Sequence, residues 1–123
     1  MLFWNQGNGR FVDVGYLTGS NRVEDGRGVA VADFDRDGRL DLVIQNRDRP
    51  AVLLMGRGES GNWLEVSLEG TESNRDAIGS KIEIWRGGNY WYRETYCGEG
   101  YLSQNSRWEH FGLGSATAVD SLT

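Results

Sequence analysis

Short runs of alternating apolar and polar residues, separated by glycine-rich turns, set the strongest limit on what this chain can fold into. The stretch WLEVSLEG is the clearest case, because Leu64, Val66 and Leu68 fall on one side of an extended strand and the residues between them on the other. The 18 glycines punctuate the sequence and do not form a low-complexity run. No segment repeats its apolar residues with a helical period. The sequence therefore predicts an all-β fold of short strands and tight turns.

The expected strands form hairpins on both sides of a linker. Before the linker, LFWN and RFVDV flank the turn QGNG, GVAVADF and LDLVIQN flank an aspartate-rich loop, and AVLLM follows. The polar, glycine-rich stretch 56–62 is the best candidate for the linker. After it come WLEVSLEG, KIEIW, the turn RGGNY, YWYRETY and RWEHFGLG. We expect two parts, residues 1–56 and residues 62–123.

The stretch ADFDRDGRLDLV places Asp33, Asp35, Asp37 and Asp41 between two apolar runs. Two carboxylates about 4 Å apart repel each other by roughly 4 kcal/mol at an effective dielectric of about 20, so such a loop either splays into water or binds a cation. The four aspartates occupy positions 1, 3, 5 and 9 of the loop, and Gly38 at position 6 permits a sharp turn. These are ligands that Ca²⁺ prefers.

The loop fits calcium without fitting an EF-hand. The Arg39 carbonyl can supply a ligand at position 7, but position 12, where an EF-hand requires a bidentate Glu, holds Ile44. The flanking segments are also β-rich rather than helical. Mg²⁺ fits less well, because it keeps its waters and a strict octahedron. The alternative is an acidic turn whose Asp side chains only accept hydrogen bonds from the backbone; the ligand spacing favours a calcium loop within a β-hairpin.

Composition excludes several other classes of protein. The net charge of −5 argues against a nucleic-acid binder, which would carry a basic patch. A single cysteine, Cys97, rules out an internal disulfide framework, and we assign it no role. No apolar run is long enough to insert across a membrane, and MLFWNQGNGR has no signal-peptide pattern. Because an apolar alternation is still under way at AVDSLT, we expect a fragment of a longer protein, so the missing signal says little about compartment.

Several of these phrases resemble known families. GRGVAVADFDRDGRLDLVIQN is similar to an FG-GAP/VCBS repeat, the blade unit of integrin-type β-propellers, and LFWNQGNGRFVDV is similar to the tail of a preceding repeat. NWLEVSLEGTESNRDAIGSKIEIW and GYLSQNSRWEHFGLG resemble the ASPIC/UnbV domain, which follows such repeats in secreted proteins. The resemblance implies propeller-blade-like hairpins at 1–56, as a partial propeller. It also implies a small antiparallel β-sandwich or barrel at 62–123 that is truncated at its C-terminal end.

The same resemblance implies a secreted, calcium-stabilised module that binds or scaffolds proteins and has no established chemistry of its own. In FG-GAP propellers the calcium stiffens the blade and the partner binds elsewhere, so the four aspartates would hold structural metal. Extracellular calcium modules bind at about 10⁻⁴ to 10⁻³ M, which favours an extracellular or periplasmic location. The expected partner is an unidentified protein or glycan, and exposed strand edges could pair with a second copy.

Two polar, glycine-punctuated loops, 72–80 and 100–106, are further candidates, because binding residues concentrate on loops. Asn74, Arg75, Asp76, Gln104 and Asn105 could together form a polar recognition surface. Asn and Ser in turns more often satisfy their own backbone, and this structural interpretation carries the greater weight.

The stretch WRGGNYWYRETY at 85–96 is the most aromatic part of the chain. Trp85 and Trp91 meet only if the hairpin register permits, whereas alternation puts Tyr90, Tyr92 and Tyr96 on one face. An exposed platform of such rings could stack on sugars or on a protein partner. Filling the core of a β-sandwich is the commoner use of aromatic residues. A carbohydrate-binding module is therefore the second hypothesis.

No motif supports an enzyme. Cys97 and His110 lack an orienting acid in a recognisable pattern, and we expect Cys97 to be a small buried hydrophobe and His110 to pack in the core. The sequence has no nucleophile elbow, phosphate loop, zinc-ligand cluster or dinucleotide fingerprint. The prediction is a non-enzymatic, calcium-binding extracellular module for protein binding or scaffolding. A third hypothesis is an accessory domain of a larger secreted enzyme.

Overall fold

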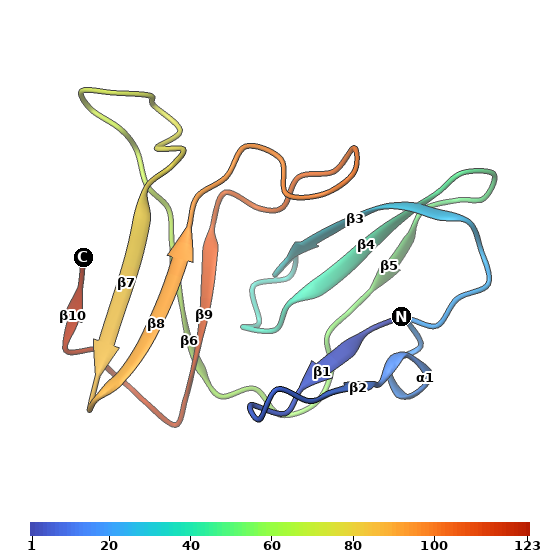
Figure 1. The fold of residues 1–123 in the computed structure, drawn as a ribbon, viewed down its shortest axis with the longest axis horizontal. Helices are drawn as coiled ribbons and strands as arrows, with labels where there is room; N and C mark the ends of the chain where they lie inside the picture. The colour runs from blue at the N-terminus through green and yellow to red at the C-terminus, as the bar shows by residue number, and fades with distance from the viewer.

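The computed structural model describes residues 1–123, and its regular secondary structure is almost entirely antiparallel β-strand (Figure 1). The elements follow one another in the order β1 (Phe3–Asn5), β2 (Phe11–Asp13), α1 (Gly15–Thr18), β3 (Gly26–Ala32), β4 (Asp41–Asn46), β5 (Val52–Leu54), β6 (Asn62–Val66), β7 (Lys81–Arg86), β8 (Asn89–Glu94), β9 (Glu109–Gly114) and β10 (Ser121–Leu122). The all-β prediction is confirmed. The single helix is one turn, and no helix is long and apolar enough to cross a membrane.

The N-terminal part, residues 1–56, contains two separate sheets. β1 and β2 form the expected hairpin, with Trp4 opposite Val12. β3, β4 and β5 form a three-stranded antiparallel sheet in that order. The aspartate-rich loop joins β3 to β4, so it lies at the tip of a β-hairpin as the sequence predicted.

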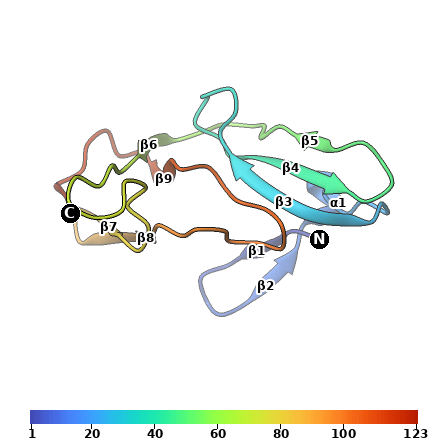
Figure 2. The same ribbon diagram turned by 90° about the horizontal axis from the view of Figure 1, so that it is seen from above.

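The C-terminal part, residues 62–123, is a sandwich of two sheets. β6 pairs with β9 in one sheet, and β7 lies between β10 and β8 in the other. Ile82 and Ile84 of β7 pack against Phe111 of β9, and all three side chains are buried between the layers seen in Figure 2. Leu64 and Val66, which the alternation assigned to one face, pack against this core. Of the two expected architectures, the structure has the sandwich.

The two parts contact each other along the edge of β3. The Val31 N–H donates to the Asn105 side-chain Oδ1 at 2.9 Å, and the Val31 carbonyl accepts a bond from the Ser106 N–H at 3.4 Å. Both partners lie in the long connection between β8 and β9, which runs beside β3 (Figure 2). The edge strand is therefore partly paired, and the aspartate-rich loop is held close to the C-terminal part.

Candidate metal centre

Three of the four predicted aspartates come together at the tip of the β3–β4 loop. Oxygen atoms of Asp33, Asp35 and Asp37 all lie within 4.8 Å of one another. Ca²⁺ binds oxygen at about 2.3–2.6 Å, so two ligands of one ion can be at most about 5 Å apart. The three carboxylates therefore fit one hard cation. Asp33 and Asp37 are half-buried, while Asp35 is exposed to solvent.

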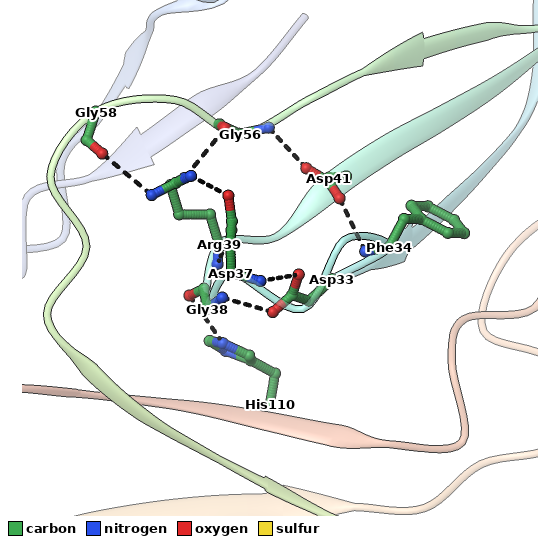
Figure 3. A network of polar contacts seen from close by, with 9 residues as sticks. All are labelled: Asp33, Phe34, Asp37, Gly38, Arg39, Asp41, Gly56, Gly58 and His110. Atoms are coloured by element: carbon green, nitrogen blue, oxygen red, sulfur yellow. Dashed lines mark hydrogen bonds and ion pairs between the residues drawn. The ribbon is translucent and has the colours of Figure 1, made fainter.

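The backbone of the loop wraps around the Asp33 carboxylate (Figure 3). Asp33 Oδ1 accepts a hydrogen bond from the Asp37 N–H at 3.1 Å, and Oδ2 accepts one from the Gly38 N–H at 2.7 Å. Gly38 makes this turn possible with a φ of 86°, in the left-handed region. A carboxylate has about four lone-pair sites, so one N–H bond to each oxygen leaves capacity for a cation. Capping of the backbone and metal binding are compatible here.

The Arg39 side chain has a role that the sequence did not predict. Its guanidinium forms an ion pair with Asp37, and it also donates to the carbonyls of Gly56 at 3.2 Å and Gly58 at 3.3 Å (Figure 3). Arg39 therefore ties a candidate ligand to the linker that begins at residue 56. Metal binding by its carbonyl stays a prediction.

The structure does not bring Asp41 into the group formed by the other three aspartates. Asp41 is 1% exposed, and its two oxygens accept bonds from the Phe34 N–H at 2.9 Å and the Gly56 N–H at 2.7 Å. Asp41 therefore bonds to the loop backbone through one oxygen and to the linker backbone through the other. These two bonds give the carboxylate a structural role, and its role as a metal ligand remains a prediction.

The charges in the loop repel one another. Partial loss of contact with water raises the pKa of the Asp35 carboxyl. The negative charges of Asp37, Asp41 and Asp33 raise the same pKa further. In this arrangement the loop binds a proton at Asp35 more readily than an isolated aspartate would. A bound cation would relieve the same repulsion and favour the ionised carboxylate.

Two rings from the C-terminal part cover the tip of the loop. His110 Nε2 lies 3.1 Å from the Gly38 carbonyl, so Nε2 carries the proton and donates it. The Trp63 indole lies so close that a Cβ added to Gly38 would be 2.0 Å from its Cδ1. Trp63 and His110 stack with centroids 5.9 Å apart. The expectation that His110 packs in the core is wrong, because its ring points to the loop (Figure 3).

Comparison with known families agrees with this arrangement. Residues 1–44 match the family described as FG-GAP-like repeat, and residues 70–123 match the family described as ASPIC and UnbV. The chain is therefore similar to an FG-GAP-like repeat in its first part and to an ASPIC and UnbV segment in its second. The resemblance drawn from the sequence is therefore confirmed, and the candidate metal loop lies within the FG-GAP-like repeat.

Three curated relatives are named cartilage acidic protein 1. The chain is 46% identical over 61 residues to that of Xenopus tropicalis, covering 49% of this chain and 9% of the relative. It is 41% identical over 82 residues to that of Mus musculus, which covers 66% of this chain and 11% of the relative. It is 37% identical over 84 residues to that of Homo sapiens, which covers 68% of this chain and 11% of the relative. The chain thus spans about a tenth of the length of these relatives. No solved structure matches it.

The polar loop at the start of the ASPIC and UnbV segment is largely satisfied by the protein itself. The Asn74 side chain donates to the Ile78 carbonyl at 3.1 Å and accepts from its N–H at 2.7 Å, so it closes its own loop. Arg75 and Asp76 form ion pairs with Glu69 at 2.9 Å and Arg107 at 2.8 Å respectively. These contacts support the structural interpretation of this loop.

The second polar loop lies beside the end of the first, and residues of both line one groove. Asn105 bonds to Val31 and donates to Glu99 at 2.6 Å, so its amide is also engaged within the protein. Gln104 is exposed and lines a groove of about 190 Å³ together with Asp76. The structure brings these two residues to one groove, whereas Asn74 and Arg75 lie outside its lining. Cys97, expected to be buried, is exposed.

The aromatic hairpin of the same segment divides its rings between two faces. Trp85 pairs with Tyr90 and their centroids are 4.5 Å apart; Tyr92 follows at 6.5 Å from Tyr90. Trp91 lies on the opposite face and packs against the core. The hairpin register therefore separates Trp85 from Trp91 and places Trp85, Tyr90 and Tyr92 in one exposed row, which we call the aromatic strip.

The tyrosines of the aromatic strip are fixed by glutamates. The Tyr90 hydroxyl donates to Glu83 at 3.1 Å, and the Tyr92 hydroxyl donates to Glu94 at 2.9 Å. The bond to Glu94 raises the pKa of Tyr92 to about 12. The rings are thereby held in place at the surface without being buried.

Proposed function

We propose that this chain is a non-enzymatic, calcium-binding module of extracellular type that serves protein binding or scaffolding. The observation that carries the proposal is the group of three carboxylates, Asp33, Asp35 and Asp37, within 4.8 Å at the tip of a hairpin. Its position inside an FG-GAP-like repeat supports calcium as the cation. The role that we propose is structural, because Asp33 and Asp41 accept hydrogen bonds from the loop backbone and Asp37 pairs with Arg39.

Calcium in this site would supply positive charge that holds the three carboxylates together. The residues of the chain do the rest. Asp33 organises the backbone of the turn, Asp35 faces solvent, and Asp37 connects the site to Arg39 and the linker. We therefore expect calcium to stiffen the hairpin tip, while a protein or glycan partner binds elsewhere on the surface.

The proposed calcium site supports an extracellular location. A module with an affinity of about 10⁻⁴ to 10⁻³ M fills in calcium-rich extracellular fluid and stays empty at cytosolic calcium levels. The name of the relatives, cartilage acidic protein 1, is in keeping with this location.

Calorimetric titration of the EDTA-treated chain with CaCl₂ tests the proposal. We expect one site in the micromolar-to-millimolar range and a higher melting temperature with calcium, both lost in the double variant Asp35→Ala, Asp37→Ala. Asp48→Ala is the matched control, because the Asp48 side chain is 83% exposed and lies outside the loop. The absence of binding heat and an unchanged melting curve in the wild type would refute calcium binding.

The aromatic strip supports a second candidate function, the binding of a carbohydrate. An exposed row of stacked rings is the kind of surface on which sugar rings stack. The structure sharpens the test: Trp85→Ala should abolish retention on a glycan array and leave the melting temperature unchanged. Trp91→Ala removes a ring that packs on the core, so it should lower the melting temperature. If the wild type binds no glycan on the array, this candidate fails.

A further inference from the structure

The tip of the candidate metal loop is one of the places where the C-terminal part contacts the N-terminal part. Gly38 is buried although it lies in a loop of a β-hairpin. Its carbonyl accepts the hydrogen bond of His110, and its α-carbon lies under the Trp63 indole. Because Trp63 also stacks on His110, the two rings act as one surface that fixes the position of Gly38.

Gly38 connects these rings directly to a candidate ligand. Its N–H donates to Asp33 Oδ2 at 2.7 Å, while its carbonyl faces His110 Nε2 at 3.1 Å. A displacement of Gly38 would therefore move the Asp33 carboxylate as well. Through this single residue, Trp63 and His110, the latter drawn in Figure 3, restrain the position of a carboxylate in the loop.

The linker between the two parts is attached to the same loop. Asp41 accepts a bond from the Gly56 N–H, and the Arg39 guanidinium donates to the Gly56 and Gly58 carbonyls. Since Arg39 also pairs with Asp37, a second candidate ligand is connected to the path of the chain toward β6. The linker and the rings of Trp63 and His110 thus both restrain the loop.

We propose that docking of the C-terminal part, through Trp63 and His110, preorganises the loop for calcium, so that calcium affinity and docking are coupled. The inference rests on the proposed function. Three carboxylates repel one another when no cation is present, and contacts that hold the loop in its binding form reduce the cost of gathering them. Coupling between two binding events is reciprocal, so calcium in turn strengthens the docking of Trp63 and His110.

The calcium affinity of His110 variants tests this coupling in the full chain. Loss of one hydrogen bond that holds the loop corresponds to a weakening of about fivefold, which we expect for His110→Leu. His110→Gln retains a side-chain N–H donor and should restore most of the affinity. Trp63→Leu should also weaken binding, whereas the matched control Trp85→Leu should not, because Trp85 lies on the exposed face of the β7–β8 hairpin and Gly38 has Trp63 against it.

Tryptophan fluorescence provides a second readout that does not depend on the stability of the His110 variants. Calcium should change the emission of the wild type, and Trp63→Phe should remove that change while Trp85→Phe keeps it. Unchanged affinities in His110→Leu and Trp63→Leu, or an emission change that survives Trp63→Phe, would overturn the coupling and leave calcium binding intact. A wild type that binds no calcium at all would overturn both proposals.

Discussion

The two parts of the molecule bury different kinds of side chain. The C-terminal part has an apolar core of Ile82, Ile84 and Phe111, whereas the buried side chains of the N-terminal part are the polar Asp41 and Asn46. Both polar side chains bond to backbone groups, and Asn46 donates to the Pro50 carbonyl at 2.9 Å. Hydrophobic burial therefore stabilises one part, and buried hydrogen bonds at loop ends stabilise the other.

The β1–β2 hairpin shows the consequence of this difference. Phe3, Trp4 and Phe11 are each more than half exposed, so the hairpin has no layer beneath it. An isolated two-stranded hairpin has marginal stability in water. The comparison indicates that the fold of the N-terminal part depends mainly on specific polar contacts and on contacts with the C-terminal part. Burial of its own apolar residues contributes less.

A matched pair of phenylalanine substitutions gives the largest expected difference. Phe111→Ala removes a buried ring and should cost about 3–5 kcal/mol of unfolding free energy. Phe11→Ala removes an exposed ring and should change it by no more than about 0.5 kcal/mol. Denaturant unfolding followed by circular dichroism measures both. Equal losses for the two variants would contradict the contrast between the parts.

The buried carboxylate of the N-terminal part should show the next largest effect. Asp41→Asn keeps the size of the side chain but replaces one acceptor oxygen by an NH₂ group that faces an N–H, which should cost about 1–3 kcal/mol. Asp48→Asn, at an exposed position, serves as the control and should have little effect. The same unfolding assay applies. If both variants retain wild-type stability, buried hydrogen bonds do not hold this part together.

Acidification should produce the smallest effect, and it should act on the N-terminal part. Because the pKa of Asp35 is raised in the folded state, ionisation of this carboxyl lowers the stability of the fold. The cost is present above the raised pKa, declines as the pH falls through it, and is gone below the pKa of an unfolded aspartate. Calcium requires the ionised form, so protons compete with it. The increase in melting temperature caused by calcium should therefore shrink between pH 7 and about pH 4.

The variant Asp35→Asn separates proton competition at this carboxyl from general acid effects. Its response to calcium should be weak at neutral pH and should depend less on pH than that of the wild type. Melting curves with and without calcium at each pH make the comparison. A calcium effect on the wild type that stays constant over this range would exclude titration of the loop carboxylates as the cause.

Local patterns predicted the strands and the loop, because both depend on residues close together in the sequence. The alternation of Leu64 and Val66 identified their buried face, and the spacing of Asp33, Asp35 and Asp37 brought them together. The faces of Trp85 and Trp91 depended on the hairpin register, which the sequence alone left open.

Contacts between distant residues could not be predicted in this way. His110 and Gly38 are 72 positions apart, and nothing near His110 in the sequence marks it as a donor to the loop. The side chain of Arg39 reaches the linker only because β4 and β5 return the chain to that point. The backbone bonds to both oxygens of Asp41 could not be predicted either, because spacing records position along the chain and not which N–H groups reach each oxygen.

Gly38 also limits how this loop could be used in protein engineering. Its φ of 86° alone would admit a residue such as Asn, which tolerates the left-handed region. The indole of Trp63 occupies the space where any Cβ would lie, so Trp63 excludes a substitution that the φ angle alone permits. The candidate metal loop, grafted from this chain onto another hairpin, would leave that backbone uncovered, and the graft should be designed together with the tryptophan that covers it.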